Sequence, residues 1–180
     1  MQPILRLRAL FLAGLVAACL APAGAQGRDW TRLFDGRTLD GWTLVGGHGP
    51  GYVVRDGMLV CPADGGGNLF TTRDYSDFVL RFQFKLDRAG NNGVAIRSPA
   101  EGNPAYDAME IQILDHDDPM YADIKPWQAH GSVYGVVPAR RTALRPAGEW
   151  NQEEITARGR RIKVVLNGTT IVDADLNQVS

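Results

Sequence analysis

The sequence predicts an all-β protein built as an antiparallel β-sandwich. Short runs of alternating apolar and polar residues recur along the chain, and turn signals separate them. The 180 residues include 21 glycines and 10 prolines, and long helical patterns are few. Many short strands with frequent turns are typical of a sandwich or jelly roll.

The first 25 residues have the order of a secretory signal peptide. Arg6 and Arg8 precede the apolar run Ala9–Leu20, and small residues follow up to Ala25. The run is shorter than the roughly 20 residues that a membrane-spanning helix needs, so no transmembrane segment is expected. In a competing interpretation, residues 16–19 form a lipobox with cleavage before Cys19. We expect an exported protein, periplasmic or extracellular, either free or lipid-anchored through Cys19.

The remaining sequence, residues 28–180, has the length of one domain. Its charges are interspersed, and the whole chain has 19 basic and 20 acidic residues. Because no basic block is present, a nucleic-acid partner is not expected. Cys61 has no partner for a disulfide in this domain, and we expect it to be a small apolar core residue.

The clearest strand is 78–87, where apolar residues occupy every second position. Residues 52–61 predict two short strands around a turn, and the Asn167-Gly168 pair predicts a tight hairpin. The glycine-rich segments 46–51 and 64–68 are expected to be loops. The other expected strands are 94–97, 108–115, 132–137, 155–157, 161–166 and 169–172.

Strand alternation in 108–115 places Glu110 and Gln112 on the face opposite the apolar residues. Arg97 lies in the preceding strand, where pairing would bring it beside Glu110. Such a pair would hold the carboxylate ionised and oriented for chemistry. The alternative is a solvated sheet face with an ordinary surface ion pair.

Histidine and carboxylate side chains gather after this strand. The run Asp115–Asp118 has the oxygen and imidazole groups that bind divalent metals, but it equally resembles a solvated turn. His130 precedes Gly131 at the start of a predicted strand, where a histidine serves as a base, a metal ligand or a capped loop residue.

Amide and aromatic side chains suited to a sugar are also present. Rings stack on the apolar face of a pyranose, and amides hydrogen-bond its hydroxyls. Trp127 has a core alternative, since aromatics supply large buried area. The candidates for binding a carbohydrate are Asn68, Asn92, Gln112, Trp127 and Tyr134, with Asn91 and Tyr106 of similar character.

Seven short segments occur along the chain in the order typical of one family: 33–42, 75–78, 91–97, 109–115, 131–135, 148–151 and 166–168. With these segments the chain resembles the 3-keto-disaccharide hydrolase domain family. The resemblance implies a concanavalin A-like jelly roll that acts on oxidised sugars. The family usually ends with a further strand after the segment at which this chain stops, so we expect the C-terminal strand to be missing.

The resemblance also implies a reaction at a sugar that carries a ketone at C3. A base removes the acidified C2 proton, the C1 substituent leaves, and water adds afterwards. His130 or Glu110 is expected to be the base. Arg97, or a divalent metal held by Glu110 and His130, would stabilise the enolate. The alternative function is a non-catalytic, lectin-like module, because this fold class also serves binding proteins.

Overall fold

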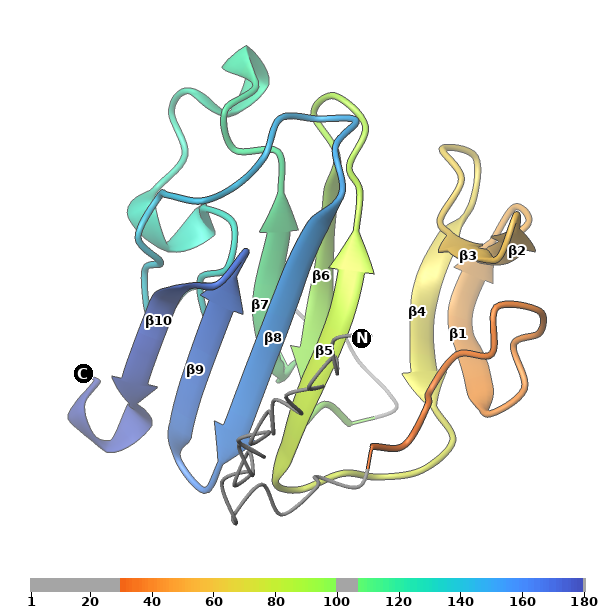
Figure 1. Ribbon diagram of the computed structural model, residues 1–180, viewed down its shortest axis with the longest axis horizontal. Helices are drawn as coiled ribbons and strands as arrows, with labels where there is room; N and C mark the ends of the chain where they lie inside the picture. Colours follow the sequence, from red (N-terminus) through yellow and green to blue (C-terminus); the bar gives the residue numbers. More distant parts are fainter. Residues whose placement is uncertain (1–29, 100–106, 180) are drawn as a thin grey trace, which may run out of the picture. The chain divides into compact units, whose positions relative to one another are not determined.

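The computed structural model describes residues 30–99 and 107–179 (Figure 1). The signal-peptide and lipobox predictions, and Tyr106, lie outside these residues. The chain divides at residue 33 into two units, and the features below belong to the second, residues 33–180. Its strands are β1 (Trp42–His48), β2 (Val53–Arg55), β3 (Met58–Val60), β4 (Gly66–Thr71), β5 (Phe78–Phe84), β6 (Asn91–Ile96), β7 (Met109–Leu114), β8 (Asn151–Arg158), β9 (Arg161–Leu166) and β10 (Thr169–Asp175). Within the described residues there are also three short 3-10 helices, η1 (Pro119–Tyr121), η2 (Pro126–Gln128) and η3 (Leu176–Gln178).

One layer is a four-stranded antiparallel sheet in the order β10-β9-β8-β5. The alternation predicted for 78–87 is confirmed, since Phe78, Leu80, Phe82 and Phe84 pack on the core from β5. The Asn167-Gly168 hairpin is also confirmed. Both residues have positive φ, 47° and 83°, as the tight turn between β9 and β10 requires.

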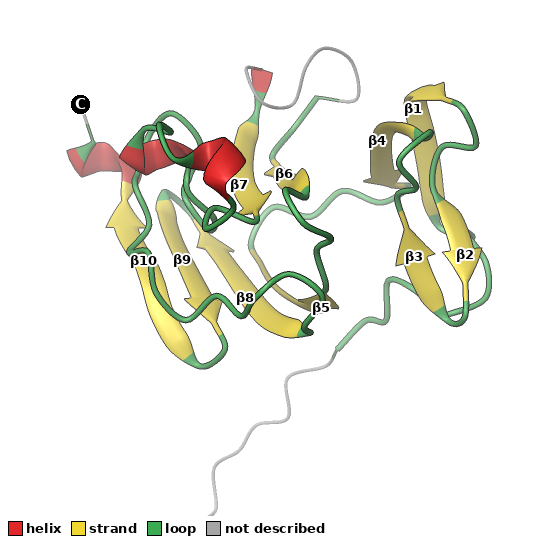
Figure 2. Ribbon diagram, turned by 90° about the horizontal axis from the view of Figure 1, so that it is seen from above, coloured by secondary structure: helices red, strands yellow, loops and turns green. Residues whose placement is uncertain are grey.

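The second layer is the antiparallel pair β6–β7, which Figure 2 shows above the four-stranded sheet. Ile96 and Ile111 from this layer share one buried cluster with Ile155 and Val164 from the other. The core therefore lies between two antiparallel sheets, and the predicted jelly-roll sandwich is confirmed. No helix in the described part of the chain is long and apolar enough to cross a membrane.

The strand predicted at 132–137 is reduced to isolated bridges. Val133 pairs with Ile111 of β7 and also with Val137, four residues further along its own segment. Gly135, with a φ of 73°, lies between the two valines. The chain therefore folds back on itself at this point instead of continuing beside β7.

The glycine-rich segments predicted as loops are only partly loop, because residues 46–48 and 66–68 belong to strands while 49–51 and 64–65 do not. β1 extends to His48, β4 begins at Gly66, and the two pair with an irregularity between Val45 and His48. A Cβ on Gly67 would lie 2.7 Å from the Cα of Gly47. These glycines allow a close approach of two backbones, a strand role that composition does not distinguish from a loop.

The prediction for Cys61 was wrong. The residue follows directly on β3 and is exposed instead of buried in the core. It precedes the turn in which the Gly65 N–H donates to the Pro62 carbonyl. A free cysteine outside the sandwich layers has no apolar cluster to join.

Candidate active site

The candidate site lies on the outer face of β7, the side away from the four-stranded sheet. Ile111 is fully buried in the core, so alternation directs its neighbours Glu110 and Gln112 outward. Gln112 is nevertheless covered, with 5% of its surface exposed, whereas Glu110 is half-buried. Glu110 is therefore the carboxylate on this face that solvent and a ligand can reach.

The carboxylate of Glu110 lies across the backbone of Gly93 on β6. A Cβ at residue 93 would come within 1.8 Å of Glu110 Oε1, so the Glu110 side chain would have to leave this position. Burial against this strand raises the pKa of Glu110 above its ordinary value of 4.5. The site thus holds a carboxylate with increased proton affinity, in a position over Gly93 that a larger residue there would displace.

Arg97 does not form the expected pair with Glu110. The residue opposite Glu110 in the β6–β7 register is Ala95. Arg97 follows the end of β6 with a φ of 54°, so strand alternation no longer governs its direction. Its Nη2 lies 3.8 Å from Asp77 Oδ1. The register brings Arg97 near the site, but its recorded ion pair is with Asp77.

His130 lies inside the sandwich, on the other side of β7 from Glu110. Its Nδ1 accepts a hydrogen bond from the Leu114 N–H at 3.2 Å, and its ring is 5.1 Å from that of Phe84. Its Nε2 lies 3.0 Å from Oε2 of Glu153, and both side chains are fully buried. The contact is close, but the N–H is not aligned with the oxygen, so it is not a regular hydrogen bond.

The structure therefore does not bring Glu110 and His130 together. Leu114 is four residues beyond Glu110, about 13 Å along the strand, and His130 is on the opposite face. A single metal ion could not bind both side chains in this arrangement. Among the residues described, no group of three or more His, Cys, Asp and Glu side chains is placed to hold a metal.

Aromatic side chains adjoin Glu110 instead. The Tyr134 N–H donates to the Glu110 carbonyl at 2.9 Å, so these residues are neighbours across the bridge between Ile111 and Val133. The Trp127 ring meets that of Tyr134 edge-on at 5.5 Å. The structure thus gathers three of the predicted residues, Glu110, Trp127 and Tyr134, in one place.

Gln128 is a member of this group that the sequence analysis missed. It ends η2 and its Nε2 donates to the Tyr134 hydroxyl at 3.0 Å. No motif marks it, because a glutamine in a short turn has no periodicity. Its spacing of six residues from Tyr134 also predicts no contact between the two side chains, because neither a helix nor a strand links them.

The two predicted asparagines lie apart from this group in the strand register. Asn92 pairs with Ile113, so it is on the inner face of β6, and its Nδ2 is 3.5 Å from the Tyr52 hydroxyl. Asn68 lies on β4 opposite Val45. Neither makes a recorded hydrogen bond to Glu110 or Tyr134.

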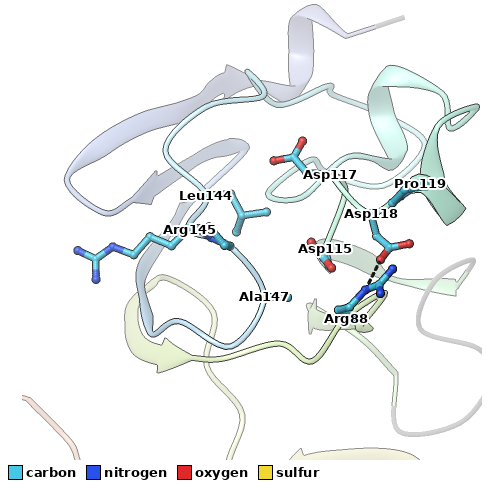
Figure 3. Close-up of a pocket in the computed structure, with 9 residues that line it drawn as sticks. Arg88, Asp115, Asp117, Asp118, Pro119, Leu144, Arg145 and Ala147 are labelled. Carbon is cyan, nitrogen blue, oxygen red and sulfur yellow. Dashed lines mark hydrogen bonds and ion pairs between the residues drawn. The ribbon is translucent and has the colours of Figure 1, made fainter.

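The Asp115–Asp118 run forms a turn beside a pocket of about 280 Å³ (Figure 3). Asp115 accepts from the Ala89 N–H, and Asp118 caps η1 by accepting from the Met120 N–H. Arg88 forms an ion pair with Asp118. These contacts explain the run as a hydrogen-bonded turn. It is not the solvated turn that the sequence left open, because Asp115 and His116 are buried, with 6% and 4% of their surfaces exposed.

The fold places the chain among jelly-roll β-sandwiches with a polar outer face. Residues 29–179 match the family described as the 3-keto-alpha-glucoside-1,2-lyase-like domain, and the chain belongs to this family.

A curated relative, the 3-keto-disaccharide hydrolase of Bacteroides thetaiotaomicron, is 28% identical over 162 residues. The match covers 74% of this chain and 53% of the relative, so the chain spans about half of that protein's length. A crystal structure from Parabacteroides distasonis, of a protein provisionally named a glycosyl hydrolase, superposes with a TM-score of 0.70 at 27% identity, covering 82% of this chain and 73% of that one. A second structure from the same organism has a TM-score of 0.65 at 23% identity, with coverage of 81% and 72%, and supports the fold alone.

Proposed function

We propose that this chain cleaves the glycosidic bond of 3-keto-glycosides, with Glu110 as the base. The observation that carries the proposal is the half-buried Glu110 carboxylate, which lies over Gly93 with its pKa raised by burial. A carboxylate with raised proton affinity, opposite Tyr134 in the strand register, suits proton removal from a sugar ring. Membership of the 3-keto-alpha-glucoside-1,2-lyase-like family supports this reaction class.

The reaction has three balanced steps. Glu110 accepts the proton from C2, and the C–H electron pair forms a C2=C3 double bond while the C3 oxygen becomes an enolate. The enolate then re-forms the ketone, a C1=C2 double bond forms, and the C1–O bond breaks with its electrons on the departing oxygen. This oxygen takes one proton from solvent, and Glu110 returns its own proton to solvent, so the carboxylate is restored. Water adds across C1=C2, so the net products are a 3-keto sugar and an alcohol.

Glu110 is favoured over His130 as the base because of access. His130 is 1% exposed and has the core on one side and β7 on the other. A base must come within hydrogen-bond distance of the proton that it removes. His130 would reach a sugar only if the two layers separated, whereas Glu110 is only half-buried and lies on the other face of β7.

The test follows aglycone release from nitrophenyl 3-keto-glucosides of both anomeric forms. Glu110→Gln should abolish release, while Glu149→Gln, the same change at an exposed residue outside β7, should leave it unchanged. Runs with a chelator and with added Mn²⁺ test the predicted divalent metal, since Glu110 offers the oxygen ligand that such ions prefer. Retention of full activity by Glu110→Gln would contradict the assignment of the base.

The same assay separates the enzyme from a lectin-like module. The Trp127–Tyr134 edge-to-face pair beside Glu110 would suit a binding module as well. A folded chain that binds the 3-keto-glucoside in calorimetry but releases no aglycone would support the binding module and contradict the enzyme.

A further inference from the structure

Tyr134 lies opposite the proposed base in the strand register, and its hydroxyl is held by a hydrogen bond from Gln128 whose direction can be established. Tyr134 is paired with Glu110 through its own backbone N–H. Side chains at directly opposed positions on neighbouring strands have Cβ atoms roughly 5 Å apart. A ligand over Glu110 therefore lies within range of the tyrosine side chain.

The direction follows from Gln128. The backbone N–H of Lys125 can only donate, and it lies 2.9 Å from one end of the Gln128 amide, which must therefore be the oxygen, Oε1. The other end, Nε2, faces the Tyr134 oxygen at 3.0 Å and can only donate. The tyrosine oxygen is thus an acceptor from Gln128, and its own proton is free to point elsewhere.

We propose that the Tyr134 hydroxyl donates a hydrogen bond to the C3 oxygen of the substrate and stabilises the enolate. This inference rests on the proposed function and deepens it by assigning the group that receives the developing charge. When Glu110 takes the proton from C2, a C2=C3 double bond forms. The negative charge then develops on the oxygen that is bonded to C3. A donor already oriented by the protein stabilises that charge without reorganising during the step.

Gln128 is then a positioning residue that acts through Tyr134. Replacement by glutamate keeps an oxygen for the Lys125 N–H but puts an acceptor in place of the donor. Tyr134 would then donate to residue 128, and its proton would be withdrawn from the substrate. Tyr134→Phe removes the hydroxyl directly and retains the ring that meets Trp127.

The experiment measures aglycone release and exchange of the C2 proton with deuterated water for four proteins: wild type, Tyr134→Phe, Gln128→Glu and the double variant. Losing one oxyanion donor typically lowers kcat by a factor of about 10²–10³. We expect a loss of that size in Tyr134→Phe, in release and in exchange alike, with KM little changed. Gln128→Glu should also lose activity, and adding it to Tyr134→Phe should cause no further loss.

The outcomes separate this inference from the proposed function. Release by the wild type, loss in Glu110→Gln and near-wild-type kcat in Tyr134→Phe would overturn the role of Tyr134 and leave the function standing. Additive losses in the double variant would overturn the role of Gln128 as acting through Tyr134. Absence of both release and exchange in the folded wild type would overturn the proposed function, and the inference with it.

Discussion

His116 should make the stability of this domain depend steeply on pH. Its side chain is 4% exposed, and its Nδ1 accepts a hydrogen bond from the His130 N–H at 3.1 Å. Burial lowers the pKa of His116 from 6.5 to about 4, helped by Arg141 and His130 and opposed by Asp117 and Asp115. The imidazole is therefore neutral in the folded protein at pH values where the unfolded chain binds a proton.

The magnitude follows from the difference between the two pKa values. At about 1.4 kcal/mol per pKa unit, the shift from 6.5 to about 4 corresponds to about 3 kcal/mol. Because the folded-state pKa is lower, the unfolded chain binds more protons between these values, and stability is lost as pH falls from 6.5 toward 4. Between pH 7.5 and pH 5 the expected loss from this one group is about 2 kcal/mol.

Urea denaturation at pH 7.5, 6 and 5 measures this loss directly. His116→Asn is the matched control, because its side-chain oxygen can still accept from the His130 N–H but does not titrate in this range. We expect the wild type to lose about 2 kcal/mol more than His116→Asn between pH 7.5 and pH 5. Equal losses in the two proteins would refute the argument that a buried neutral imidazole is responsible.

Three further predictions concern the site and the core. Gly93→Ala should displace the Glu110 carboxylate, since the new Cβ would lie 1.8 Å from Oε1, and kcat for aglycone release should fall sharply; an unchanged kcat would contradict the described seat. The raised pKa of Glu110 should place the acidic limb of the pH profile of kcat above pH 4.5. Glu110→Gln should also raise the melting temperature at pH 7.5 but not at pH 4. The reason is that the free-energy cost of burying the charged carboxylate appears only as pH rises through the folded-state pKa. Ile155→Ala should cost about 2–5 kcal/mol in urea denaturation, since Ile155 is fully buried between the two layers, and a cost below about 1 kcal/mol would contradict that packing.

Local patterns in the sequence were sufficient for much of the fold. The alternation along β5, the Asn167-Gly168 turn and the outward direction of Glu110 each depend on residues close together in the chain. A strand with one buried face must alternate apolar and polar residues, and a two-residue hairpin needs residues that adopt positive φ. These features can therefore be predicted from one segment without knowing which strand it pairs with. The same reasoning identified Glu110, Trp127 and Tyr134 as candidates.

Only the tertiary structure decided which of these residues meet. The close approach of Gly47 and Gly67, the seat of Glu110 on Gly93 and the hydrogen bond from Gln128 to Tyr134 all depend on the pairing and register of segments whose contacts the sequence does not specify. His130 shows the same limit, because its sequence neighbours suit a site residue, whereas packing against Phe84 and Glu153 places it in the core. Residue type and periodicity are local properties, but the distance between two side chains is set by how the sheets pair and pack.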